Sequence, residues 1–273
     1  MLQSVHGLGE RLELAAYLSG KRLAHRLNPR YRGRAHERCL FVAGVQRSGT
    51  NLLMEVLERC NETDVYHETD PRAFERYQLR DEATLHRLVA CSPAPLVVIK
   101  CLMESQRLKH LLEVFGPAQA IWVFRGYRDA VNSMVKSFSN QARQVLRVAQ
   151  GQQEWWSEHM VPETLAIVRE AAAKPLDDVS AAALQWYFRN RIYFDQRLAD
   201  DQRIMLLKYE GLVLEPAATL ERISTFAGIK CGPRAMRIIS ANPIGKRTPP
   251  AIRPDVAELC EALQARLLLA ASV

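Results

Sequence analysis

The segment 44–51, Gly-Val-Gln-Arg-Ser-Gly-Thr-Asn, carries the clearest chemical signal in the sequence. It ends the apolar run Cys39–Gly44, and its glycines at positions 44 and 49 have the spacing of loops that hold a phosphate at a helix N-terminus. A Walker A loop would have Lys at position 50 and Ser or Thr at position 51. This chain has Thr50 and Asn51 there and carries its cation on Arg47. The loop therefore suits a phosphate-like anion but lacks the residues that usually bind ATP with Mg²⁺.

A second candidate anion site begins at Arg125, directly after the apolar run Ala120–Phe124. Ser133 lies eight positions later, two turns into a helical pattern. A guanidinium binds a phosphate through two parallel hydrogen bonds, and a serine hydroxyl adds a neutral donor. The pair could therefore hold a second phosphate.

The elements that must position these residues alternate between short apolar runs and longer helical patterns. The expected strands are Cys39–Gly44, Leu96–Lys100, Ala120–Phe124 and Ile204–Lys208. The expected helices are Asn51–Cys60, Glu104–Phe115, Tyr127–Ser139, Ala181–Ala199 and Pro216–Ala227. Continuous apolar strands separated by helices indicate an α/β protein with a central parallel sheet flanked by helices. Ligands of such sheets bind at the carboxyl ends of the strands, where both candidate anion sites occur.

The chain contains no repeat, low-complexity tract or Gly/Ser linker, which predicts one α/β domain over residues 39–273 behind a basic helical arm, residues 1–38. Residues 140–180 interrupt the alternation as a helical insertion. The insertion contains Trp155 and Trp156, which either form a lid over an acceptor site or pack the insertion onto the core. Packing is the commoner fate of tryptophan, and we favour it.

The charge is unevenly distributed along the chain. The net charge is +7, and residues 1–38 contribute +5 of it, from eight Lys/Arg and three Asp/Glu. Because no groove-reading motif accompanies these charges, we expect no nucleic-acid partner. The arm either contacts an anionic membrane surface or is an ordinary solvated helix.

The remaining composition is that of an ordinary soluble protein. The 48% hydrophobic and 25% charged residues exclude a disordered or fibrous chain. No apolar run approaches the roughly 18–20 residues that span a bilayer, and the first 30 residues lack a signal-peptide core, so we expect a cytoplasmic protein. The six cysteines occur singly, away from zinc-ligand spacing, and we expect no metal site.

Taken in order, these segments resemble the P-loop-like sulfotransferases, which use 3′-phosphoadenosine 5′-phosphosulfate (PAPS) as sulfuryl donor and release 3′-phosphoadenosine 5′-phosphate (PAP). The run 45–53 is similar to their 5′-phosphosulfate loop, although Asn51 stands where a second Thr is usual. Arg125 with Ser133 is similar to their 3′-phosphate motif, with Gly126 in place of the usual Asp or Asn. The resemblance implies a set of donor-binding residues: Arg47, Ser48, Gly49, Thr50, Asn51, Leu52, Arg125, Ser133 and Tyr209.

Two further segments extend the resemblance. Lys208-Tyr209-Glu210 looks like the family's late strand ending in Tyr-Glu, which implies that Tyr209 supports the nucleotide and that Glu210 is structural. The loop containing Lys246 and Arg247 is similar to one that closes over the 3′-phosphate in family members. That match is loose, and a plain surface turn is an equal alternative.

Transfer of a sulfuryl group to a hydroxyl requires a general base and cations that offset charge on the leaving phosphate. The pair Glu68-Thr69 resembles the Glu-Thr of the tyrosylprotein and related Golgi-type branch, which implies that Glu68 is the base. The same branch has a lysine at the place of Lys100, and Arg47 would assist it. The cytosolic branch has Lys-Thr-His there, whereas Cys and Leu follow Lys100 here. His67 is a competing base, but strand alternation should point it away from Glu68.

The leading hypothesis is therefore a PAPS-dependent sulfotransferase acting on a hydroxyl of a sugar, lipid, phenol or other small molecule, or of a peptide. Two alternatives stay open from the sequence. One is a P-loop kinase-like enzyme with a degenerate Walker motif, and the other is a non-catalytic nucleotide-binding protein. Glu68 as a solvated loop carboxylate and Lys100 as a structural, paired lysine are the corresponding alternatives for the two residues.

Overall fold

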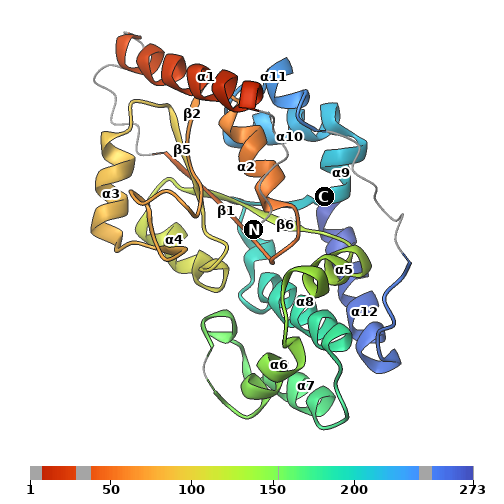
Figure 1. Ribbon diagram of the computed structural model, residues 1–273. Helices are drawn as coiled ribbons and strands as arrows, with labels where there is room; N and C mark the ends of the chain where they lie inside the picture. Colours follow the sequence, from red (N-terminus) through yellow and green to blue (C-terminus); the bar gives the residue numbers. More distant parts are fainter. Residues whose placement is uncertain (1–7, 29–37, 153, 240–247, 273) are drawn as a thin grey trace.

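The computed structural model describes residues 8–28, 38–152, 154–239 and 248–272. Its centre is a five-stranded parallel sheet in the order β2-β5-β1-β6-β7 (Figure 1). The strands are β1 (Cys39–Gly44), β2 (Thr63–Tyr66), β5 (Leu96–Lys100), β6 (Gln119–Phe124) and β7 (Ile204–Lys208). The prediction of an α/β protein with a parallel sheet is confirmed. A small antiparallel hairpin, β3 (Phe74–Glu75) with β4 (Gln78–Leu79), lies outside the sheet.

The strands are apolar along their length because both faces of the sheet are buried. Phe41 and Ile99 belong to one hydrophobic core, whereas their chain neighbours Leu40 and Val98 belong to the other, as the alternation of side chains along a strand requires. The first core also receives side chains from α3 (Glu82–Cys91), α4 (Leu108–Val114), α5 (Tyr127–Ser137), α8 (Asp178–Asp195) and α12 (Pro254–Ala271). The second receives them from α2 (Thr50–Glu58), α9 (Tyr209–Leu214), α10 (Pro216–Ala227) and α11 (Pro233–Met236).

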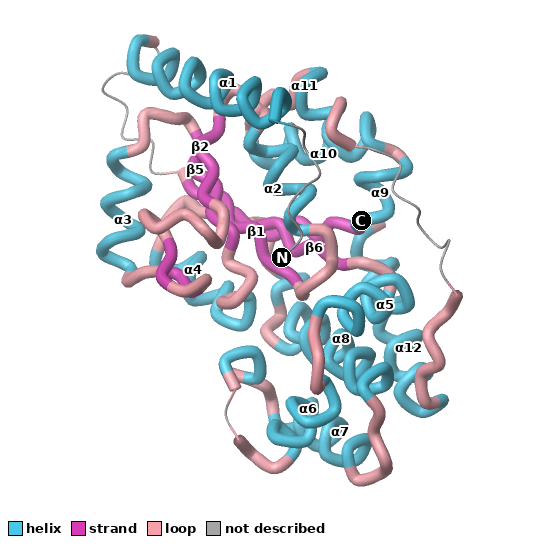
Figure 2. The backbone as a smooth tube through the Cα atoms, in the orientation of Figure 1, coloured by secondary structure: helices cyan, strands magenta, loops and turns pink. Residues whose placement is uncertain are grey.

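The strand order sets where a ligand can bind. From β1 the chain moves first to β2 and β5 on one side, and later to β6 and β7 on the other. The turns that follow β1 and its two neighbours therefore diverge at the carboxyl end of the sheet and leave a crevice between them. Figure 2 shows these strands at the centre, and the loop of residues 45–49 joins the end of β1 to α2.

The segment between residues 140 and 180 is helical. It contains α6 (Gln141–Ala149), a 3₁₀ turn at Trp155–Ser157 and α7 (Pro162–Ala172). These helices lie together at the end of the molecule away from α1 (Leu8–Leu27), where α6 and α7 pack beside α8 (Figure 1). The segment therefore extends the wall formed by α8 beyond the sheet.

Helix α1 is held on the protein by polar contacts to the end of α2 and the start of β2. The Tyr17 hydroxyl donates to the Arg59 carbonyl at 3.0 Å, and Lys21 Nζ donates to the Glu58 carbonyl at 2.8 Å and to Thr63 Oγ1 at 3.0 Å. Burial lowers the pKa of Lys21 to about 8. Among the helices in the described ranges, none is long and apolar enough to cross a membrane.

Candidate active site

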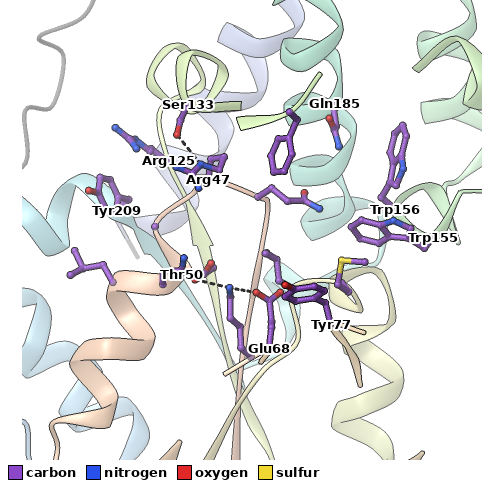
Figure 3. Close-up of a pocket in the computed structure, with 18 of the residues that line it drawn as sticks. Arg47, Thr50, Glu68, Tyr77, Arg125, Ser133, Trp155, Trp156, Gln185 and Tyr209 are labelled. Atoms are coloured by element: carbon purple, nitrogen blue, oxygen red, sulfur yellow. Dashed lines mark hydrogen bonds and ion pairs between the residues drawn. The ribbon is translucent and has the colours of Figure 1, made fainter. Parts of the chain in front are cut away.

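A cavity of about 780 Å³ opens at the carboxyl end of the sheet (Figure 3). It is lined by residues of the 44–51 loop, the ends of β5 and β6, the β3–β4 hairpin and the helical segment after α5. The lining residues are Gln46, Arg47, Gly49, Thr50, Asn51, Leu52, Glu55, Glu68, Tyr77, Lys100, Leu102, Met103, Arg125, Ser133, Phe138, Gln141, Gln144, Trp155, Trp156, Gln185 and Tyr209. Among the predicted site residues, Ser48 is buried behind this surface, and Lys246 and Arg247 lie outside the described residues.

The loop before α2 has a backbone that only glycine adopts easily. Gly49 has φ +98°, and a Cβ on it would lie 2.0 Å from Tyr209 Cδ2. Arg47 also has a positive φ, +68°. Gly49 is the residue that precedes the first turn of α2, and no side chain caps that turn. The first N–H groups of α2 therefore face the cavity side of the loop, as they do in sites that bind anions.

The two predicted anion sites are joined in the structure. Arg47 Nε donates to Ser133 Oγ at 2.8 Å, so the 44–51 loop and α5 are in direct contact. The Arg125 guanidinium lies 4.7 Å from the centre of the Tyr209 ring and 3.4 Å from Asp129. Arg125 Nε and Ser48 Oγ are buried without a hydrogen-bond partner among the described residues. Arg125 lines the cavity, and an unpartnered guanidinium N–H there is a feature expected where an anionic ligand completes the hydrogen bonding.

The start of α5 is capped by side chains from distant elements. The N–H of Gly126 donates to Glu210 Oε1 at 3.0 Å, and the N–H of Tyr127 donates to Gln264 Oε1 at 2.9 Å. The carbonyl of Arg125 accepts from Trp186 Nε1 at 3.0 Å. The usual side-chain cap after the arginine is absent because position 126 is glycine, and α9 and α12 supply it instead. Glu210 therefore makes a structural contact at the start of α5, in line with the structural role expected from the sequence.

Glu68 and Lys100 meet because β2 and β5 are neighbours in the sheet. Lys100 Nζ lies 2.5 Å from Glu68 Oε2 and donates to Asn51 Oδ1 at 2.7 Å. The lysine side chain is 3% exposed and the glutamate 18%, so the pair is shielded yet borders the cavity. His67 points elsewhere: its Nε2 lies 3.4 Å from Glu58, and it does not line the cavity.

The tryptophans pack and line the cavity at once. Trp156 is 4% exposed and stacks on Phe188 with ring centres 5.3 Å apart, while Trp155 is partly buried beside it. Sequence reasoning did not identify several other residues that line the cavity, among them Tyr77, Phe138 and Gln185. No motif marks them, because they come from a two-residue hairpin turn, a helix end and the middle of a buried helix.

Comparison with known proteins now gives the class. Residues 74–233 match the Sulfotransferase family, and the chain belongs to that family. The protein is therefore a sulfotransferase, an enzyme of sulfuryl transfer. This membership decides against the kinase-like and non-catalytic alternatives. No curated protein matches the chain.

Several solved sulfotransferases resemble the structure. STF9 from Mycobacterium avium is 17% identical, with 96% of this chain and 82% of that chain covered and a TM-score of 0.50. The sulfotransferase domain of the curacin biosynthetic pathway is 13% identical, and the match covers 82% of this chain and 96% of that chain with a TM-score of 0.50. Mouse SULT7A1, complexed with PAP, is 16% identical, and the match covers 83% of this chain and 67% of that chain with a TM-score of 0.42. The likeness to STF9 and to the curacin domain shows the fold alone.

Proposed function

We propose that the sulfuryl donor is PAPS and that the acceptor is a hydroxyl. The observation that carries this proposal is the contact between Arg47 and Ser133, which links the helix N-terminus loop to the Arg125 site. One ligand with an anionic group at each end of a nucleoside would satisfy both sites together. Arg125 and Ser133 would hold the 3′-phosphate, and Arg47 with the N–H groups of the loop would hold the 5′-phosphosulfate.

We assign the general base to Glu68. In the transfer step the acceptor oxygen forms a bond to sulfur, the bond from sulfur to the phosphate oxygen breaks, and the hydroxyl proton passes to the Glu68 carboxylate. Protonation removes the negative charge that neutralises Lys100, 2.5 Å away. The ammonium charge is then free to offset the charge that develops on the leaving phosphate. The electrostatic stabilisation of the leaving phosphate by Lys100 thus increases as the proton moves to Glu68.

Calorimetric titration with PAP in the presence of EDTA tests the donor. We expect micromolar binding without Mg²⁺, weakened roughly 10- to 100-fold in Arg125→Ala because charge-assisted hydrogen bonds are lost. Arg128→Ala is the matched control, since Arg128 pairs with Glu261 and is 54% exposed. Binding of ATP with Mg²⁺ in preference to PAP would refute the assignment.

Glu68→Gln tests the base while keeping a side chain of the same size beside Lys100. We expect unchanged PAP affinity and a turnover lower by about 10²- to 10⁴-fold, the usual contribution of a general base. His67→Asn removes the competing imidazole and should retain turnover. If instead His67→Asn loses turnover and Glu68→Gln does not, the base is His67.

A further inference from the structure

The cavity has two ends of different chemistry. Arg47, Arg125 and Tyr209 lie at one end, and Trp155, Trp156 and Gln185 lie at the other, with Glu68 between them (Figure 3). Among the described lining residues, the cations are Arg47, Lys100 and Arg125, all at or beside the donor end. The far end, which we call the acceptor end, is therefore aromatic and polar, and its described lining side chains carry no positive charge.

The acceptor end contains buried amide oxygens without partners, on α8 and on α6, which packs against α8. Gln141 is 2% exposed and Gln185 is 6% exposed, and the Oε1 atom of each is buried with no hydrogen-bond partner. Both side chains line the cavity. A buried polar atom without a partner is costly, so such atoms in a cavity wall indicate that a ligand supplies the missing hydrogen bonds.

The aromatic wall of this end is fixed in place from behind. Arg189 is fully buried, does not line the cavity, and donates to the Trp156 carbonyl at 3.1 Å and to Gln106 Oε1 at 2.8 Å. Gln106 Nε2 in turn donates to the Trp155 carbonyl at 2.9 Å, and the Arg189 guanidinium lies 5.5 Å from the centre of the Trp155 ring. The backbone of both tryptophans is thus held before any ligand binds, as preorganised recognition requires.

We propose that the acceptor end binds an uncharged sugar, so that the sulfuryl group is transferred to a hydroxyl of a neutral carbohydrate; this rests on the proposed function. A sugar ring offers flat C–H faces that pack on indole rings, and hydroxyls that both donate to and accept from amide groups. A phenol or sterol would leave Gln141 and Gln185 unpartnered. An acidic polysaccharide or acidic peptide would find no cation among the described side chains that line this end.

An acceptor panel with ³⁵S-labelled PAPS tests the proposal. The panel contains neutral monosaccharides as free sugars and as octyl glycosides, 4-nitrophenol, cholesterol and an acidic polysaccharide. We expect product from the neutral sugars, and the free and octyl forms together distinguish a soluble sugar from the head group of a glycolipid. If PAP binds and 4-nitrophenol, cholesterol or the acidic polymer is the better acceptor, the sugar proposal fails while the proposed function stands. Failure to bind PAP would instead refute the proposed function.

Variants localise the effect. Gln185→Leu and Gln141→Leu each remove one amide, and we expect the KM for the sugar to rise about 10-fold for each while the Kd for PAP stays within twofold. Trp155→Leu should raise the KM similarly, and Trp155→Phe should recover most of the loss. Gln152→Leu is the matched control, because Gln152 lies outside the cavity and accepts from Arg147. Equal shifts in sugar KM and PAP Kd would show a general distortion and overturn the assignment.

Discussion

Replacing Gly49 by alanine tests whether the loop before α2 and the Tyr209 ring form one close-packed unit. The new Cβ would lie 2.0, 2.6 and 2.9 Å from three ring atoms of Tyr209. Carbon atoms normally pack about 3.5–4.0 Å apart, so the ring or the loop must move by about 1.5 Å. The +98° φ of Gly49 adds about 1–3 kcal/mol of backbone strain. Because the ring packs against Arg125, its displacement disturbs the donor site too.

A double-mutant cycle separates the two contributions. We expect Gly49→Ala to lower the free energy of urea unfolding by about 2–6 kcal/mol, summed from strain and overpacking, and to weaken PAP binding. In the Tyr209→Ala background the overpacking disappears, so the same change should cost about 1–3 kcal/mol less. Gly232→Ala is the control, since a Cβ there meets nothing within 4 Å. Costs that add to within about 0.5 kcal/mol would refute the close packing between loop and ring.

Three further predictions concern other parts of the protein. Gly20→Ala, in an open position of α1, should stabilise the protein by about 0.5–1 kcal/mol in urea unfolding. Burial raises the pKa of Glu104 from 4.5 to about 7, so the folded protein binds this proton more tightly than the unfolded chain does. The free energy of unfolding should therefore fall as the pH rises between those values. Glu104→Gln should remove this fall, which amounts to at most about 3 kcal/mol between pH 4 and 8. The Cys60 thiol, 2.8 Å from Cys231, donates a hydrogen bond that lowers the pKa of Cys231 below its usual value. Iodoacetamide should therefore label Cys231 at a lower pH than an ordinary thiol, and Cys60→Ala should move the midpoint of labelling to higher pH.

The sheet could be predicted because each strand carries its own signal. Leu96–Lys100 and Ile204–Lys208 match the predicted bounds residue for residue, since strands buried on both faces are apolar without interruption. The expected helix Glu104–Phe115 is instead a 3₁₀ turn, Ser105–Arg107, followed by α4. Ser105 explains the difference, because its hydroxyl bonds the N–H and carbonyl of Gly44 in β1 rather than leaving the turn to continue as regular helix.

The donor end of the cavity was accessible to sequence reasoning, whereas the acceptor end was not. The spacing around Arg47 and the place of Arg125 after a strand are local features, and the sheet brings them together. Gln141 and Gln185 sit in helical segments where most glutamines are solvated, and nothing in their neighbours marks them. Their burial arises from packing between α6 and α8, which has no local sequence signature.

The capping of α5 by Glu210 and Gln264 has a consequence for the order in which the protein folds. These contacts close chain separations of 84 and 137 residues, and contacts across such loops form late. The N-terminus of α5 therefore depends on the docking of α9 and α12, and a ligand bound at Arg125 would stabilise that docked arrangement by mass action.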